Sequence, residues 1–119
     1  DIAVGEEVRA VRDIAVGEEI CVNYFGEAVQ QPTAARLATL REGFRFNCRC
    51  AVCLAADPAS DARRARIVQL GEEILTCRSQ PDEGIRKAKE SLELLAEERI
   101  GAPRTAAQIC NDGFELALL

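Results

Sequence analysis

The sequence predicts an α+β protein, with a small β-hairpin in its first third, a cysteine-rich loop near its middle and an α-helical C-terminal region of paired helices. Three observations lead to this prediction. Residues 20–25 read ICVNYF, which alternates Ile20, Val22 and Tyr24 on one strand face with Cys21, Asn23 and Phe25 on the other. Three cysteines fall within six positions at 48–53. After residue 57, apolar residues recur at helical spacing, and a proline precedes each such stretch.

The hairpin is expected from strands at 8–12 (VRAVR) and 20–25, with a turn at Gly17 and the acidic pair that follows it. Two short strands form only a marginal ribbon with unpaired edges. We therefore expect residues 1–25 to complete a larger sheet or to pack on the helices.

The N-terminal heptapeptide DIAVGEE (1–7) recurs at 13–19. Two copies at this short period cannot build a solenoid, so we interpret the repeat either as a local duplication or as two equivalent hairpin arms. The heptapeptide lacks the basic and apolar regions of a signal peptide, and no run of about 18 apolar residues could span a bilayer. We expect an intracellular protein, nuclear or cytoplasmic, without membrane contact.

The composition describes one domain with a modest core, because a chain of 119 residues with 48% hydrophobic content buries roughly two-thirds of its unfolded surface. A formal charge of −5 with 4% aromatic residues argues against direct nucleic-acid binding, which needs clustered cations and stacking rings. The basic stretch ARRAR at 62–66 is surrounded by acidic residues and is expected to be a solvated helix face. Histidine, the commonest general base and metal ligand, is absent from the sequence.

The helices have local start and stop signals. Thr33 can cap the first helix, which we expect to end at Gly43. The other three helices are expected to begin at Pro58, Pro81 and Pro103. Asp57, just before Pro58, can cap the helix that begins there. The apolar stripes expected to face the core are Leu37 and Leu40; Ile67, Leu70, Ile74 and Cys77; Ile85, Ala88, Leu92 and Leu95; and Ala106, Ile109, Cys110, Gly113 and Ala117.

The spacing of Cys48, Cys50 and Cys53 favours a zinc site. Thiolates two and three residues apart on a tight turn can converge on one tetrahedral ion, and Arg45 and Arg49 would offset part of their charge. A disulfide is the main alternative, although an intracellular setting disfavours it and one thiol would remain unpaired. Three cysteines without a special role are the second alternative.

A structural zinc site needs a fourth ligand, which the sequence does not identify. The candidates are Cys21, Cys77, Cys110, a partner chain or a missing segment. Cys77 and Cys110 lie on apolar helix stripes, where a free cysteine usually behaves as a small core residue.

Two stretches, RAVRDIAVGEEICVNYFG and RLATLREGFRFNCRCAVC, together resemble the C-terminal half of a SET domain followed by a post-SET zinc motif, as in SET-and-MYND and related fungal SET proteins. The resemblance covers about residues 8–54, and the helical tail is similar to the helix-pair region of that family in loose pattern only. SET proteins are protein-lysine methyltransferases that use S-adenosylmethionine.

The resemblance implies a role for six residues. Tyr24 would be the catalytic tyrosine that orients the target lysine amine, and Asn23 and Phe46 would lie beside the cofactor. Three of the four zinc ligands would be Cys48, Cys50 and Cys53. Methyl transfer to a deprotonated lysine needs alignment and exclusion of water, which a site without histidine can provide.

The sequence departs from the family pattern in the half that binds the methyl donor. It contains no Gly-x-Gly segment and, having no histidine, no Asn-His-x-Cys segment. A truncated gene product, an excerpt of a longer enzyme and a degenerate protein would each explain this, and we expect the isolated chain to be inactive.

The expected organisation is a partial SET domain at 1–47, a zinc loop at 48–54 and a helical region at 57–119. The expected function is that of a partial protein-lysine methyltransferase whose partner is a substrate lysine. The alternative is a zinc-stapled helical module that binds a partner peptide without catalysis.

Overall fold

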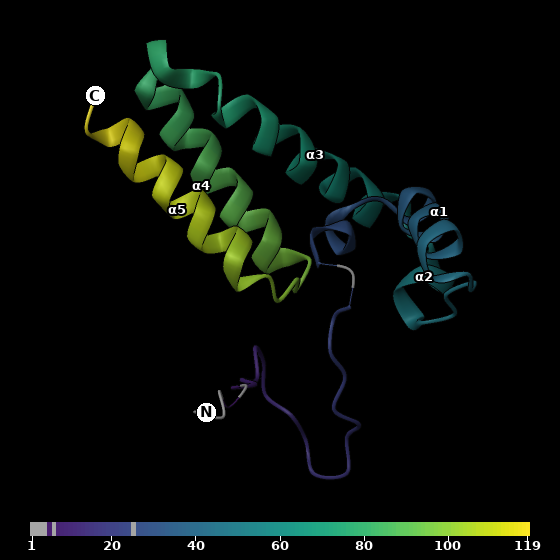
Figure 1. Cartoon of the computed structure of the whole chain (residues 1–119). Coiled ribbons are helices and arrows are strands. Elements are labelled where there is room, and N and C mark those ends of the chain that lie inside the picture. Colours follow the sequence, from purple (N-terminus) through teal and green to yellow (C-terminus); the bar gives the residue numbers. More distant parts are fainter. Residues whose placement is uncertain (1–4, 6, 25) are drawn as a thin grey trace.

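The structure is a computed structural model that describes residues 5, 7–24 and 26–119 (Figure 1). An extended segment at 7–24 leads into a small group of helices, and a layer of longer helices lies beside that group. In chain order the elements are η1 (Gly26–Gln30), α1 (Thr33–Phe44), α2 (Ala51–Ala55), α3 (Pro58–Ile74), η2 (Cys77–Ser79), α4 (Pro81–Glu97) and α5 (Pro103–Ala117).

The β-hairpin predicted for the first third is not formed, so the prediction of an α+β fold is wrong: residues 7–24 and 26–119 contain helices and no strand. The predicted turn is present, with Gly17 at φ 82° and the Glu18 N–H donating to the Ala15 carbonyl at 3.1 Å. The segments on either side do not pair, because an isolated two-stranded ribbon buries too little surface to hold itself together. Phe25 and residues 1–4 and 6 of the first heptapeptide lie outside the described residues.

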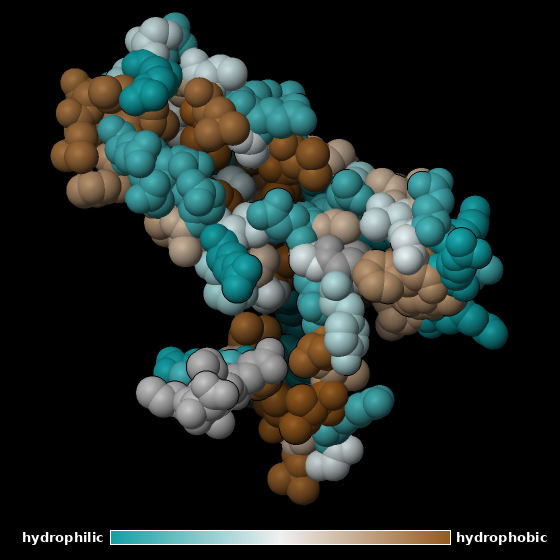
Figure 2. All heavy atoms as spheres, in the orientation of Figure 1, coloured by the Kyte–Doolittle hydropathy of each residue, from teal (hydrophilic) through white to brown (hydrophobic). Residues whose placement is uncertain are grey.

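The extended segment exposes apolar side chains, among them Val8, Val16 and Ile20 (Figure 2). Its contact with the helices is at Val11, which lies against Gly101 in the connection between α4 and α5. A Cβ atom on Gly101 would come within 2.4 Å of Val11 Cγ2. Glycine at position 101 therefore provides the space that Val11 occupies.

The prolines begin the long helices as predicted: they are the first residues of α3, α4 and α5. The Asp57 side chain caps α3 by accepting a hydrogen bond from the Ala59 N–H at 3.1 Å.

Helix α4 lies between α3 and α5 and packs on both (Figure 1). No helix in this described part combines the length and apolar composition needed to cross a membrane. The buried residues of the shared core are Ile67, Ile74, Cys77, Ala88, Leu95, Ile109 and Leu116.

Some predicted details of the helices are wrong. Helix α1 does not end at Gly43 but continues to Phe44, and Arg45 closes it in the left-handed region at φ 57°. Cys110 and Ala117 are exposed, because the buried face of α5 runs through Ile109 and Leu116. A shift of one position on a helix rotates a side chain by about 100°, so Cys110 leaves the core face.

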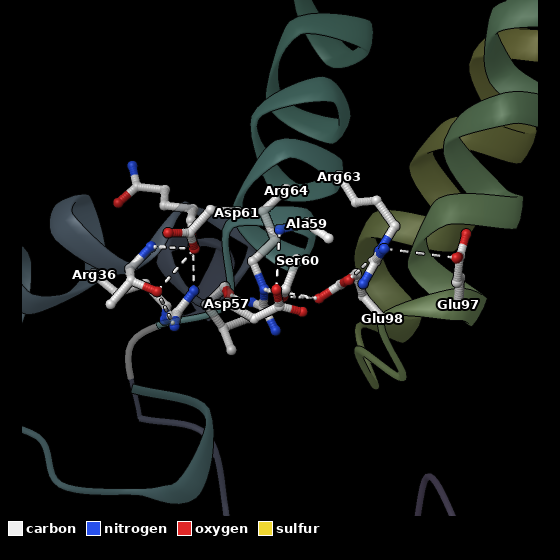
Figure 3. Close-up of polar contacts among 12 residues, drawn as sticks. Arg36, Asp57, Ala59, Ser60, Asp61, Arg63, Arg64, Glu97 and Glu98 are labelled. Carbon is white, nitrogen blue, oxygen red and sulfur yellow. Dashed lines mark hydrogen bonds and ion pairs between the residues drawn. The ribbon is translucent and has the colours of Figure 1, made fainter. Parts of the chain in front are cut away.

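A buried ionic cluster joins the start of α3 to the end of α4 (Figure 3). The Arg64 side chain is almost fully buried, donates Nε to Glu98 Oε2 at 3.0 Å and also donates to the Val29 carbonyl of η1. Ser60 Oγ donates to the same carboxylate oxygen at 2.6 Å, and Arg63 pairs with the other oxygen. The prediction that 62–66 is a solvated face is therefore wrong for Arg64.

Gly84→Ala should destabilise the helical layer, although alanine favours a helix more than glycine does. A Cβ at Gly84 would lie 2.4 Å from Leu116 Cδ1 and 2.8 Å from Cys77 Cβ, and overpacking of this kind costs about 1–3 kcal/mol. Gly71→Ala is the matched control, because nothing lies within 4 Å of its Cβ position, and it should stabilise the protein by about 0.5–1 kcal/mol. Urea unfolding followed by circular dichroism measures both. Equal effects of the two substitutions would contradict the close approach at Gly84.

Glu98→Gln should destabilise the protein by about 3–5 kcal/mol at neutral pH, because it leaves the buried Arg64 without its counter-ion. Burial opposes ionisation of Glu98, but hydrogen bonds from Ser60 and Arg63 and the charge of Arg64 outweigh it and lower the pKa of this carboxyl. The stabilisation is therefore complete above the unfolded-state pKa, about 4.3, and is lost as the pH falls through the lower folded-state pKa.

Unfolding free energies of wild type and Glu98→Gln, measured from pH 7 to about pH 3, test this dependence. Their difference should shrink on acidification. Glu97→Gln is the control, since its contact with Arg63 is long, at 3.8 Å, and exposed, and it should cost less than about 1 kcal/mol. A wild-type advantage that stays constant with pH would show that Glu98 does not act through its charge.

Candidate metal centre

Three cysteines gather where α1 gives way to α2. The left-handed conformation of Arg45 turns the chain out of α1, and residues 45–50 form an irregular loop. Cys50 then occupies the N-cap position of α2, which brings Cys53 back over the loop on the first turn of that helix. The three cysteines were predicted to lie on one tight turn. Cys53, the last of them, lies instead in the short helix α2.

The Sγ atoms of Cys48, Cys50 and Cys53 all lie within 4.8 Å of one another. Thiolates bound to one tetrahedral zinc at about 2.3 Å would be roughly 3.8 Å apart, so small side-chain adjustments would suffice to bind the ion. An all-sulfur donor set suits zinc well. The cluster therefore fits the predicted zinc site in ligand type and in spacing.

The three sulfurs differ in environment. Cys53 is only 8% exposed, Cys48 is half-buried and Cys50 is exposed. Burial raises the pKa of Cys53 to about 11, and the thiols of Cys50 and Cys48 contribute in the same direction while Arg36 opposes them. Burial acts against ionisation of Cys50 too, but hydrogen bonds from the Cys53 N–H and from the neighbouring thiols prevail and lower its pKa. Cys50 thus ionises before Cys53.

The remaining cysteines do not join this cluster. All six are free thiols, so the disulfide alternative is not formed. Cys77 is a buried core residue, as predicted, and its Sγ donates to the Glu73 carbonyl at 3.2 Å. Cys21 and Cys110 are exposed. Within the residues that the structure describes, the three-cysteine group gains no further cysteine or carboxylate.

A second layer of polar contacts lies behind Cys53. Arg36, on the buried face of α1, directs Nη2 toward Cys53 Sγ at 3.8 Å. The N–H and Oγ1 of Thr33 both donate to Asp61 Oδ1 of α3 at 2.8 Å, and these hydrogen bonds lower the pKa of Asp61 (Figure 3). The N-terminus of α1 is thus capped by a carboxylate from another helix and not by the Thr33 side chain, as the sequence had suggested.

Sequence reasoning missed Arg36, although a signal was present. Thr33, Arg36 and Leu40 are spaced three and four residues apart and form the buried face of α1. A cation at a buried position of an amphipathic helix, close in sequence to a cysteine cluster, indicates a nearby negative charge.

The three residues predicted for catalysis and cofactor binding line neither of two hollows found in the described part of the chain. Tyr24 is 82% exposed, Phe46 is 49% exposed, and Asn23 donates Nδ2 to the Gly26 carbonyl at 2.9 Å. These hollows are lined by other residues, at the Val11 contact and at the C-terminal end of α5. The roles of Tyr24, Asn23 and Phe46 stay predictions.

Two known proteins are similar to this chain. N-lysine methyltransferase SMYD2-B of Danio rerio is 38% identical over 71 residues, which are 58% of this chain and 16% of the zebrafish protein. Protein SET DOMAIN GROUP 41 of Arabidopsis thaliana is 42% identical over 52 residues, 44% of this chain and 9% of the plant protein. No protein-family model matches the chain, and no solved structure does. The similarities support a relationship to SET-domain methyltransferases. The matched segment is less than a fifth of the length of either relative.

The chain should bind one equivalent of Zn²⁺ or Co²⁺, and Cys53→Ser should weaken binding by about 10- to 100-fold or more. Affinity should increase with pH, because each thiol loses a proton on binding. Elemental analysis and the thiolate–cobalt absorption bands measure this, with Cys110→Ser as control because that thiol is exposed and remote from the cluster in sequence. A triple serine variant at positions 48, 50 and 53 that retains the metal would rule out the site.

Proposed function

We propose that this chain is part of a SET-type protein-lysine methyltransferase, comprising the C-terminal half of a SET domain, a post-SET zinc motif and a helical tail, and that Cys48, Cys50 and Cys53 bind a structural zinc ion. The observation that carries the proposal is the convergence of these three sulfurs within 4.8 Å in a chain similar to a protein named as an N-lysine methyltransferase. Zinc would hold the loop at 45–50 to the start of α2, and so hold Phe46 in place.

The fourth zinc ligand is proposed to come from a protein segment outside the cluster. A structural site with three thiolates is completed by a fourth nitrogen or sulfur donor. Cys77 is buried in the core of the helical layer. Cys21 and Cys110 are exposed and lie outside the three-cysteine group. A further segment of a longer polypeptide, or a partner chain, would therefore complete the coordination.

We propose that the described residues need further polypeptide to form a site for S-adenosylmethionine. Tyr24 and Phe46 are exposed, and Asn23 contacts its own turn. We therefore assign methyl transfer to an assembly that includes more of the length of the relatives. In that assembly the Tyr24 hydroxyl would orient the lysine amine, and Asn23 and Phe46 would contact the methyl donor.

The extended segment at 7–24 supports this assembly. Its backbone lacks a partner strand in the described part of the chain, and Val8, Val16 and Ile20 are exposed (Figure 2). Unpaired extended backbone with apolar side chains is a ready template for pairing with another strand. A sheet supplied by further polypeptide would bury these residues together with Tyr24.

A zinc-stapled helical module that binds a partner peptide is the second candidate. The helices α3, α4 and α5 have a core of their own, which favours a body that folds without the extended segment. Free thiols and the absence of disulfides suit a reducing compartment, so we propose a nuclear or cytoplasmic location for either function.

Calorimetric titration with S-adenosylmethionine separates the two functions. The chain alone should show no binding. A chimera in which this chain replaces the similar segment of the zebrafish relative should bind the cofactor and methylate lysine in a peptide. In that chimera Tyr24→Phe should lower turnover by about 100-fold, because the amine loses an orienting contact.

Zinc content and helicity of the chimera serve as controls, since Tyr24→Phe should leave both unchanged. Wild-type turnover in Tyr24→Phe would remove Tyr24 from the catalytic site. Micromolar cofactor binding by the chain alone would contradict the proposal that the donor site needs further polypeptide.

A further inference from the structure

We propose that Arg36 is a positioning residue of the metal centre: its guanidinium is the counter-ion of the zinc–thiolate group and orients Cys53. The inference rests on the proposed zinc site and adds to it a residue that does not itself bind the metal. The structure contributes three observations: the burial of Arg36, its contacts, and the link from those contacts to α3.

Arg36 is a buried cation without a direct ion pair: Asp61 acts on its charge only from beyond Thr33, whose hydroxyl bridges the two side chains. Its side chain donates to the Gln31 carbonyl at 2.6 Å, to Thr33 Oγ1 at 3.2 Å and to Cys53 Sγ at 3.8 Å, and the residue is only 3% exposed. No Asp or Glu of the described residues lies within ion-pair distance of it. Removal of a charge from water without a counter-ion is costly, so a negative group is expected at this position.

Arg64 shows how this protein accommodates a buried arginine elsewhere. It is buried to a similar degree, at 5% exposed, and its guanidinium pairs with Glu98 at 3.0 Å. The corresponding partner of Arg36 is a sulfur. A neutral thiol would leave Arg36 with only the bridged Asp61 as a counter-charge, whereas a zinc ion bound by three or four thiolates carries net negative charge in direct contact with the guanidinium.

The contacts of Arg36 also fix its position. Thr33 Oγ1 accepts from Arg36 and donates to Asp61 of α3 at 2.8 Å (Figure 3). Since Arg36 also donates to Cys53 Sγ, a hydrogen-bonded relay runs from α3 to Cys53. Groups that hydrogen-bond to a metal ligand orient it, and their loss typically weakens metal affinity by about 10- to 100-fold. The relay assigns that role to Arg36 and a supporting role to Thr33.

Zinc affinity of the complete chain, measured by competition with a chromophoric chelator, tests the proposal, and the Co²⁺ absorption spectrum reports the thiolate geometry. Arg36→Gln should bind zinc about 10- to 100-fold more weakly and should shift the cobalt bands. Arg36→Lys keeps the charge and should recover most of the affinity, whereas Arg36→Met keeps much of the volume without charge and should not. Arg41→Gln is the matched control, because Arg41 lies on the same helix, is exposed and bonds Asn47 beside the cluster.

Thr33→Val removes only the hydroxyl of the relay and provides a second test that does not depend on the folding of the Arg36 variants. It should weaken zinc binding in the same direction by a smaller factor. Circular dichroism should show unchanged helicity, since the core of α3, α4 and α5 includes none of these residues.

The outcomes are distinguishable. If the wild-type chain binds no zinc, the proposed site and this inference both fail. If wild type binds zinc and Arg36→Gln or Thr33→Val binds it equally well with an unchanged cobalt spectrum, only the inference fails. Equal losses in Arg36→Lys and Arg36→Met would assign Arg36 to packing and would overturn its role as counter-ion.

Discussion

The contact between Arg64 and Glu98 is the constraint on which the arrangement of this protein depends. It joins the start of α3 to the end of α4, and through the Val29 carbonyl it also holds η1, the element that leads into α1. Asp61, one helical turn before Arg64 on α3, accepts two hydrogen bonds from Thr33 and holds the N-terminus of α1. The first two turns of α3 thus position both the helical layer and the helix that leads to the cysteine loop.

The metal centre depends on this arrangement in a direct way. Helix α1 carries Arg36 to the buried sulfur of Cys53, and its C-terminal turn delivers Cys48 and Cys50 to the same place. Under the proposed zinc site, binding energy gained at the sulfurs would reach α3 through Arg36 and Thr33, because those side chains are shared between the two parts. Metal binding and helix packing would then be coupled thermodynamically, as is common for small metal-stabilised domains.

The sequence predicted those features that depend on neighbouring residues. Prolines at 58, 81 and 103 begin helices as expected, and the spacing of Cys48, Cys50 and Cys53 predicted their convergence. The hairpin failed because strands need partners that sequence alternation does not supply. The prediction that Arg64 is exposed to solvent was wrong for a similar reason. Its counter-ion, Glu98, is 34 residues away in the sequence, so the local charge pattern did not reveal it.

The uneven burial of the three sulfurs would determine the kinetic behaviour of a metal bound at the proposed site. Cys53 is shielded by α1 and Arg36, while Cys50 faces solvent. Oxidants and competing chelators would reach the exposed thiolate first, and ligand exchange would proceed from that side while the shielded sulfur kept its bond to the ion. Retention of the metal would then be governed by the lifetime of one solvent-facing bond, and a redox change at that bond would be transmitted inward to α3.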